Sequence, residues 1–369
     1  MKNKIESIQI LRGLAALAVV LFHYRFYLVP DGADRTGPDA LFSWGGIGVD
    51  LFFVISGFIM NYVTDDKGYG LKTSAHFMVN RLIRILPMYY LILLVAFFTD
   101  GAMSIFHYAD KVDNFISALT FKPYLPSPAP LYIESSGMYN VRWTLNYEMY
   151  FYLAFALCLL IKPRRIALFF WFSLPVVVAG YLSGNVTLGT QGYAFDSVLA
   201  RFLTNPIILE FAFGVLAGYF YKKFNRYVED KSALLPMLLL IAIGIGIYQQ
   251  KLTAFNLLSA MAFSALVLSF ALYSQAITRV FPRLFITLGN ISFSLYLIHI
   301  PLANFISDKT EKVLPGIMHT VPGFFILIFM SILVAYLTYH YIEIKLTRFL
   351  RKKLNTARPG VINGTPQGE

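Results

Sequence analysis

The chain has 369 residues, of which 57% are hydrophobic and only 14% are charged. This composition excludes an ordinary soluble protein and favours an integral membrane protein. The single cysteine, Cys158, excludes an internal disulfide and a cysteine-rich metal site, so no metal is expected. A net charge of +11 would suggest nucleic-acid binding in a soluble chain, but in a membrane protein the side that carries the charge matters more, and no nucleic-acid partner is expected.

Continuous apolar runs of about 20 residues predict transmembrane helices rather than strands. Pro175 interrupts the fifth run and Glu210 enters the sixth, so these two are the least regular. The sequence therefore predicts an all-α integral membrane protein with about ten transmembrane helices. The ten candidate spans lie near residues 8–29, 43–63, 83–99, 143–161, 166–182, 204–221, 233–249, 254–273, 284–306 and 321–343.

The distribution of positive charge predicts the orientation of these spans. Of the 31 Lys and Arg residues, 21 fall on the side of the N-terminus, nine fall on the opposite side, and Arg12 lies inside the first span. Because cytoplasmic loops carry the excess of Lys and Arg, we expect both termini in the cytoplasm. The first span has no small-residue cleavage site after it, so we expect a retained membrane helix rather than a signal peptide.

The chain divides into a transmembrane domain, residues 1–350, and a cytoplasmic tail, residues 351–369, that is basic at first and then disordered. Residues 100–142 form a proline-containing loop on the outer side that is too long for a simple connection. Two interpretations stay open for this loop: a lid that contacts substrate, or a loose surface excursion.

Two ionisable side chains, Arg12 and His23, lie inside the first span. Eleven residues at 100° each bring them within about 20° of the same helix face, and roughly 16 Å separates them along the axis. A buried arginine is costly in lipid, and a histidine can carry protons near neutral pH. This stripe therefore predicts chemistry across the membrane.

Counting residues from the helix ends gives the expected depth of the other ionisable groups. Arg12, Arg81 and Arg84 are expected to form a cationic layer at the cytoplasmic face. A second layer, in the outer half, is expected to hold His23, Asp50, Glu148, Glu210 and His299. The alternative without a catalytic role is that these ionisable groups only pair with one another, or that the side chain of Glu210 reaches to the membrane interface.

Two short motifs allow both structural and functional interpretations. The glycine pattern Gly45–Gly48 can bring helices into close contact or cradle an anion, and close packing is the favoured interpretation. Arg81 and Arg84 are three residues apart, so they share a helix face and suit phosphate binding, but ordinary anchoring at the cytoplasmic surface fits them equally well.

Five segments between residues 10 and 301 form one ordered set: Leu11–Ala16 with His23, Gly48–Phe58, Arg81–Pro87, Trp143–Tyr152 and Ile291–Pro301. Together and in this order they resemble the membrane-bound acyltransferase-3 family, which O-acylates sugars of bacterial surface polysaccharides. The chain as a whole is most similar to the exopolysaccharide-acetylating subgroup that has no fused soluble domain.

The resemblance implies a multi-pass protein of the bacterial plasma (inner) membrane that moves an acyl group, expected to be acetyl. The implied donor is cytoplasmic acyl-CoA as co-substrate, and the implied acceptor is a hydroxyl of a glycan or lipid-linked sugar on the outer side. Membrane lipids and polysaccharide-assembly proteins are the further expected partners. The resemblance also implies essential roles for Arg12 and His23, with the histidine as the catalytic base.

Acyl transfer from a thioester to an alcohol needs a base for the hydroxyl proton. We expect His23 to be that base, oriented by Glu148 or Asp50, and Arg12, Arg81 and Arg84 to bind the donor. The expected supporting residues are Ser56, Tyr147, Ser294 and His299, with Ser56 also conceivable as a covalent acyl carrier.

Two other classes of function compete with this hypothesis. One is a proton-coupled transporter or exporter of a polysaccharide precursor, in which His23, Asp50 and Glu148 form a proton relay. Its paired broken helices are not evident in the sequence. The other is a non-catalytic partner in polysaccharide assembly, in which the intramembrane charges could be replaced without effect.

Overall fold

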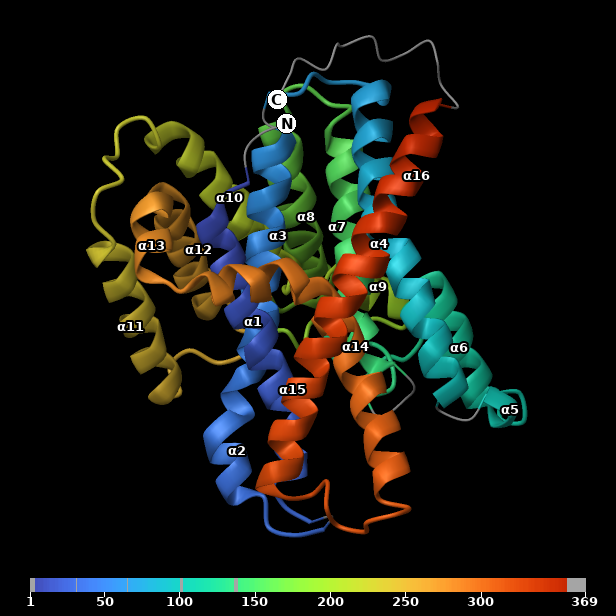
Figure 1. Cartoon of the computed structure of the whole chain (residues 1–369). Coiled ribbons are helices and arrows are strands. Elements are labelled where there is room, and N and C mark those ends of the chain that lie inside the picture. Colours follow the sequence, from blue (N-terminus) through green and yellow to red (C-terminus); the bar gives the residue numbers. More distant parts are fainter. Residues whose placement is uncertain (1–3, 31, 65, 100–101, 136–138, 357–369) are drawn as a thin grey trace.

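The computed structural model describes residues 4–30, 32–64, 66–99, 102–135 and 139–356, and every regular element in these ranges is helical (Figure 1). Short 3-10 turns cover Arg25–Leu28, Ser43–Ile47 and Asn140–Arg142, and a π-helical turn covers Tyr339–Glu343. The α-helices are α1 Glu6–Tyr24, α2 Thr36–Phe42, α3 Gly48–Thr64, α4 Leu71–Thr99, α5 Ala102–Ile105, α6 Ala109–Thr120, α7 Trp143–Cys158, α8 Arg164–Ser183, α9 Val198–Leu203, α10 Ile208–Phe224, α11 Leu234–Tyr248, α12 Leu257–Leu272, α13 Ser274–Val280, α14 Arg283–Thr310, α15 Val321–Thr338 and α16 Ile344–Thr356.

Each of the ten predicted spans corresponds to a helix, which identifies a multi-pass membrane protein. Among the described residues, seven helical segments are long and apolar enough to cross a membrane, or eight with the pair α12–α13, which is bent by 91°. Helices α7 and α11 have 16 and 15 residues. At 1.5 Å per residue they are shorter than the roughly 30 Å hydrocarbon layer, so the count of ten stays a prediction.

Several boundaries differ from the prediction. Helix α4 begins at Leu71, twelve residues before the expected start at residue 83, because polar and charged residues such as Lys72 and Arg81 continue the helix beyond the apolar run. Helix α8 continues through Pro175. The first, basic part of the tail belongs to α16 up to Thr356, and the part expected to be disordered lies among residues 357–369, outside the described part of the chain.

Helices α1 and α14 form the central contact of the fold and run in the same direction. A Cβ atom placed on Gly289 of α14 would lie 1.8 Å from the carbonyl oxygen of Gln9, and one on Gly13 of α1 would lie 2.9 Å from the amide nitrogen of Gly289. Small residues let membrane helices approach this closely. The two backbones are therefore held in one fixed register.

Glycines also bring α3 against α10 and the start of α3 against α1. A Cβ atom on Gly214 would lie 1.9 Å from the carbonyl oxygen of Val54, and one on Gly45 would lie 2.2 Å from that of Ala18. A Cβ atom on Gly48 would lie 2.5 Å from the carbonyl oxygen of Ala15. The glycine pattern before Asp50 thus serves close packing, as expected.

The segment between α4 and α7 is packed in its described parts, so a loose excursion is the wrong interpretation for them. The hydroxyl of Tyr89 in α4 donates to the carbonyl of Ala118 in α6 at 2.7 Å. Arg142 is fully buried and donates to the carbonyl of Asn114 at 3.3 Å and to Oγ of Ser117 at 3.2 Å. These contacts fix α6 to the helical bundle.

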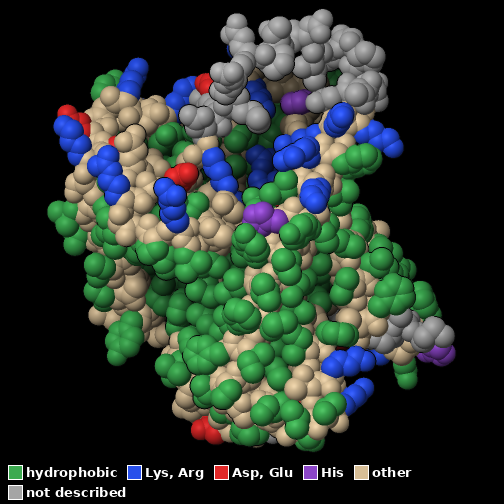
Figure 2. Space-filling model, in the orientation of Figure 1, with side chains coloured by type: hydrophobic (Ala, Val, Ile, Leu, Met, Phe, Trp, Pro, Cys, Tyr) green, Lys and Arg blue, Asp and Glu red, His purple; other side chains and the backbone are tan. Residues whose placement is uncertain are grey.

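The two ends of the bundle differ in charge. Helix α1 begins and α16 ends at the upper end in Figure 1, while α2 and the connection between α14 and α15 lie at the lower end. Figure 2 shows an apolar belt around the middle and many Lys and Arg side chains at the upper end, where they surround a hollow. We call these the basic end and the opposite end.

Candidate functional site

A cavity of about 90 Å³ lies in the half of the bundle nearer the basic end. Helices α1, α3, α4, α7 and α14 all contribute side chains to it, so residues far apart in the sequence meet there. We call it the arginine cavity. The polar residues that line it are Arg12, Ser56, Arg81, Arg84, Thr144, Glu148, Tyr152, Ser292 and Tyr296.

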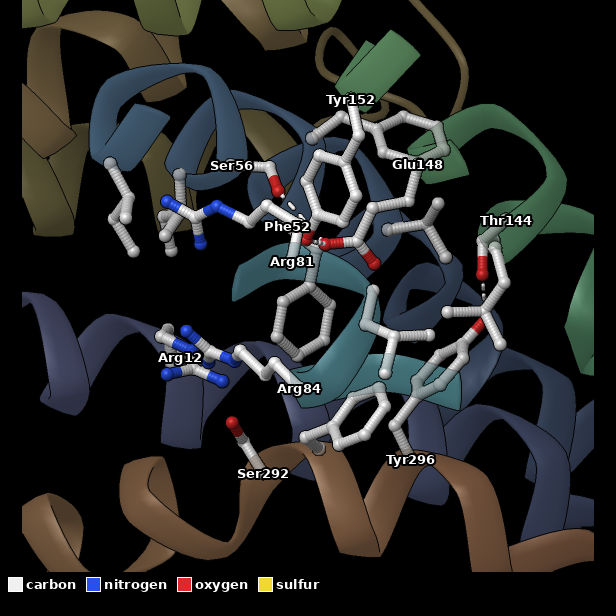
Figure 3. A pocket seen from close by; sticks show the side chains of 17 residues that line it. Arg12, Phe52, Ser56, Arg81, Arg84, Thr144, Glu148, Tyr152, Ser292 and Tyr296 are labelled. Carbon is white, nitrogen blue, oxygen red and sulfur yellow. Dashed lines mark hydrogen bonds between the residues drawn. The ribbon is translucent and has the colours of Figure 1, made fainter. Parts of the chain in front are cut away.

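The three arginines were predicted to form one cationic layer, and the structure brings them together. Figure 3 shows their guanidinium groups gathered toward one side of the cavity, with Thr144 and Tyr296 on the other side. Arg12 donates to Oε1 of Gln9, one turn earlier on α1, at 3.1 Å. The guanidinium of Arg81 lies 5.4 Å from the ring centre of Phe77 and 5.5 Å from that of Tyr152, which orients it by cation–π contact.

Glu148 lies in the arginine cavity and not beside His23. Its Oε1 accepts hydrogen bonds from Oγ of Ser56 at 3.2 Å and from the hydroxyl of Tyr152. Arg12 and Arg81 both interact electrostatically with this carboxylate. Glu148 therefore balances part of the arginine charge, and the expectation that it contacts His23 is wrong.

A second carboxylate approaches the arginines from the other side. Glu343, in the π-helical turn, interacts electrostatically with Arg12 and Arg84 and accepts a hydrogen bond from Oγ of Ser294 at 2.6 Å. Outside the spans, partial burial and the positive charges of Arg12 and Arg84 lower the pKa of Lys4 to about 8. The mouth of the cavity is thus strongly positive but not uniformly so.

Tyr296 forms the inner wall of the arginine cavity. Its hydroxyl shares a hydrogen bond with Oγ1 of Thr144 at 2.7 Å and donates to the carbonyl of Val141 at 3.1 Å. The ring of Phe52 packs edge-on against Tyr296 at 5.9 Å between centres. Beyond this wall, the carbonyl oxygen of Tyr296 contacts Nδ1 of His299 at 2.8 Å.

His23 and His299 form a pair directly behind the wall. Nε2 of His299 lies 3.2 Å from Nδ1 of His23, and the ring centres are 5.0 Å apart. Nδ1 of His23 also lies 2.9 Å from the carbonyl oxygen of Val19. Both histidines were expected in one layer, and they do meet. In the described part of the chain, however, the side chain within hydrogen-bond distance of His23 is this second histidine and not a carboxylate.

A separate cavity of about 380 Å³ opens toward the opposite end, and we call it the histidine cavity. It shares no lining residue with the arginine cavity. The surface combines hydroxyl, amide, carboxyl and aromatic groups. Its lining residues are His23, Tyr24, Phe26, Tyr27, Ile300, Ala303, Asn304, Ser307, Asp308 and His319.

Asp50 is placed in neither cavity, and its expected contact with His23 is also wrong. Its Oδ1 accepts hydrogen bonds from the backbone N–H groups of Phe255 at 2.8 Å and Asn256 at 3.3 Å. Its neighbour is Glu210, which is 1% exposed and so does not reach the interface. The predicted outer layer of five ionisable groups therefore divides into three places, because depth along a helix does not determine the direction of a side chain.

The remaining predicted residues have mixed placements. Ser56 lines the arginine cavity, whereas Ser294 serves as a partner of Glu343. Tyr147 is fully buried, stacks on Phe202 at 4.2 Å between ring centres, and donates to the carbonyl of Pro130 at 3.1 Å. Its role is to hold the segment before α7 against the bundle.

Sequence reasoning missed Tyr152, Thr144, Tyr296 and Glu343 as members or neighbours of the site. Tyr152 is four residues after Glu148, so helical spacing alone could have predicted their contact. Each histidine of the pair also follows a contact glycine, Gly13 or Gly289, by ten residues. That equal spacing on two helices was a usable signal for the pair.

Comparison with known proteins identifies several relatives of the chain. A 34% identical match over 52% of the chain is the exopolysaccharide production protein ExoZ of Rhizobium meliloti, and the chain covers 55% of that protein. "Putative O-acetyltransferase SACOL0978" of Staphylococcus aureus is 25% identical over 95% of the chain, which covers 58% of its length. The acyltransferase MdmB of Streptomyces mycarofaciens is 24% identical over 80% of the chain, with 78% of that protein covered.

The chain thus spans somewhat more than half the length of the first two of these relatives. No solved structure matches it. The sequence profile of the acyltransferase-3 family, described as an acyltransferase domain, matches residues 5–340, nearly the whole chain. The protein is therefore a membrane-embedded member of the acyltransferase-3 family.

Proposed function

We propose that the protein transfers an acetyl group from acetyl-CoA to a sugar hydroxyl of a surface polysaccharide or of its lipid-linked precursor. The donor enters the arginine cavity from the cytoplasm, and the acceptor enters the histidine cavity from the outer side of the plasma membrane. The observation that carries this proposal is the position of the His23–His299 pair between two cavities of different chemistry.

The arginine cavity suits the donor. Arg12, Arg81 and Arg84 offer planar, permanently charged donors that bind phosphate oxygens in pairs. Phe52 and Tyr296 form the apolar inner end of this cavity, along which the pantetheine arm extends, and the Tyr296 wall must shift for the thioester to reach His23. The ExoZ and O-acetyltransferase relatives support an acetyl group and a polysaccharide acceptor.

The chemistry assigned to His23 is that of a general base. The acceptor hydroxyl oxygen attacks the thioester carbonyl carbon, and its proton passes to His23. The tetrahedral intermediate then collapses, the carbon–sulfur bond breaks, and the CoA thiolate takes that proton as it leaves. Acetyl ester and free CoA are the products.

The test compares His23→Ala with His340→Ala as matched control. Nδ1 of His340 also contacts the carbonyl oxygen four residues earlier, at 3.0 Å, but this histidine is exposed and lines neither cavity. With purified protein, labelled acetyl-CoA and the polysaccharide as acceptor, His23→Ala is expected to abolish acetylation at normal membrane abundance, and His340→Ala to retain it. Acetylation by His23→Ala would refute the base assignment.

An acyl-enzyme route through Ser56 has one specific observation in its favour, the hydrogen bond from its Oγ to Glu148. If Ser56 carries the acyl group, Ser56→Ala abolishes turnover and a labelled ester accumulates on the wild-type protein without acceptor. Direct transfer predicts reduced but measurable turnover for Ser56→Ala and no labelled protein.

The transporter alternative is less well supported by the geometry. Its relay would need His23, Asp50 and Glu148 in one connected group, and these three residues have different partners. Turnover of labelled acetyl-CoA by the purified protein separates the alternatives, because a transporter or a non-catalytic assembly partner would show none.

A further inference from the structure

We infer that His299 is a positioning residue that fixes the tautomer of His23 and leaves Nε2 of His23 as the free base. The inference rests on the proposed function for its catalytic meaning, but the tautomer itself follows from the contacts of the two rings.

The first step is the protonation of His299. Its ring is fully buried, and its Nδ1 faces two backbone carbonyl oxygens, that of Tyr296 at 2.8 Å and that of Leu295 at 3.2 Å. A carbonyl oxygen can only accept a hydrogen bond, so Nδ1 of His299 carries the hydrogen. In a neutral imidazole the other nitrogen, Nε2, then has a lone pair and can only accept.

The second step transfers this constraint to His23. Nδ1 of His23 faces Nε2 of His299 at 3.2 Å and the carbonyl oxygen of Val19 at 2.9 Å. Both of these partners are acceptors, so Nδ1 of His23 carries the hydrogen and shares it between them. The opposite tautomer would place a lone pair against two other lone pairs in a buried site, which is unfavourable.

The third step concerns the remaining nitrogen. With its hydrogen on Nδ1, neutral His23 has its lone pair on Nε2. Within the described part of the chain, Nε2 of His23 has no hydrogen-bond partner, and the residue lines the histidine cavity. The base is therefore available to a hydroxyl in that cavity without a change of tautomer.

This arrangement differs from a triad in which a carboxylate orients the histidine. Here two backbone carbonyls and a neutral second imidazole do so. When His23 takes the acceptor proton, its Nδ1–H donor strengthens toward Nε2 of His299, which can share the positive charge. His299 thus orients the base before the reaction and stabilises its charged form during it.

The first measurement is independent of activity. Nitrogen-15 NMR of protein labelled in histidine distinguishes the two neutral tautomers, and the signal of His23 is assigned by its loss in His23→Gln. The inference predicts hydrogen on Nδ1 and an unprotonated Nε2. Hydrogen on Nε2 of neutral His23 would overturn it, whether or not the protein acetylates sugars.

The second measurement separates positioning from packing. His299→Gln keeps an acceptor oxygen on this side chain, His299→Leu keeps only its bulk, and Ser331→Ala is the control. Ser331 contacts the hydroxyl of Tyr24, which also donates to the carbonyl of His299, so this control perturbs the surroundings of the pair but neither ring.

We expect kcat of His299→Leu to fall roughly tenfold or more at little-changed KM, with most of the loss recovered in His299→Gln. Ser331→Ala should keep a kcat close to that of the wild type. Equal losses in the Gln and Leu variants would overturn the acceptor role of His299. If His23→Ala still acetylates while the NMR tautomer is as expected, the proposed function fails but the tautomer assignment stands.

Discussion

Substitution of Gly289 by alanine tests the central contact of the fold. The new Cβ atom would lie 1.8 Å from the carbonyl oxygen of Gln9, whereas ordinary contacts begin at 3.4 Å. Because the obstacle is backbone, α1 and α14 must separate by about 1.6 Å at this point. Such overpacking costs about 1–3 kcal/mol. The separation also lengthens the 3.2 Å contact between His23 and His299.

The matched control is Gly244→Ala in α11, where an added Cβ meets no atom within 4 Å. Alanine favours helix over glycine by up to about 1 kcal/mol, so this control should be neutral or slightly stabilised. Thermal unfolding in detergent and acetylation rate are the assays. Gly289→Ala should unfold several degrees lower, at about 2–4 °C per kcal/mol, and turn over more slowly. Unfolding temperatures and rates equal to those of Gly244→Ala would refute the close contact.

Two further predictions concern the arginine cavity, and a third concerns the connection between α14 and α15. Tyr152→Phe removes a hydrogen bond to Glu148. Because a hydrogen bond to a charged group contributes about 1.5–3 kcal/mol, the KM for acetyl-CoA in steady-state kinetics should rise about tenfold. An unchanged KM would contradict a role of Tyr152 in orienting Glu148. Glu343→Gln removes a negative charge that competes with donor phosphates for Arg12 and Arg84. The KM for acetyl-CoA should therefore fall roughly threefold at low salt, and this difference from the wild type should shrink at high salt. A change in KM that does not depend on salt would contradict this electrostatic competition. Hydrogen bonds from the backbone N–H groups of Gly316 and Met318 lower the pKa of Glu311, so this carboxylate stabilises the connection before α15 at neutral pH and loses that effect as the pH falls through its lowered pKa. Wild type and Glu311→Gln should therefore differ in the rate of proteolysis of this connection at pH 7, and the two rates should converge at acidic pH. A difference that increases at acidic pH would contradict the stabilising role of ionised Glu311.

Much of the fold could be predicted from the sequence because hydropathy and helical period are local properties. Ten apolar runs predicted ten helical segments, and the spacing of Arg81 and Arg84 predicted one shared helix face, from which both residues line the arginine cavity. The extension of α4 to Leu71 was missed because hydropathy marks the hydrocarbon layer and not the end of a helix.

The partners of the charged residues could not be predicted in the same way. Counting along a helix gives depth, and depth placed His23 and His299 correctly together. Glu148 and Asp50 were assigned to the same layer, but their rotation about the helix axis depends on which neighbouring helix each one packs against. That information lies in contacts between distant segments, such as α3 with α10, and no local pattern carries it.

The wall at Tyr296 has a consequence for the electrical potential across the membrane. Within the described residues, the arginine cavity and the histidine cavity share no lining residue, and Tyr296 lies between the first cavity and His299. Each elementary charge that leaked across would dissipate about 2.3 kcal/mol per 100 mV of membrane potential. In the proposed function, the barrier formed by Tyr296, Phe52 and the buried His299 would limit such leakage of ions while the acyl group passes it.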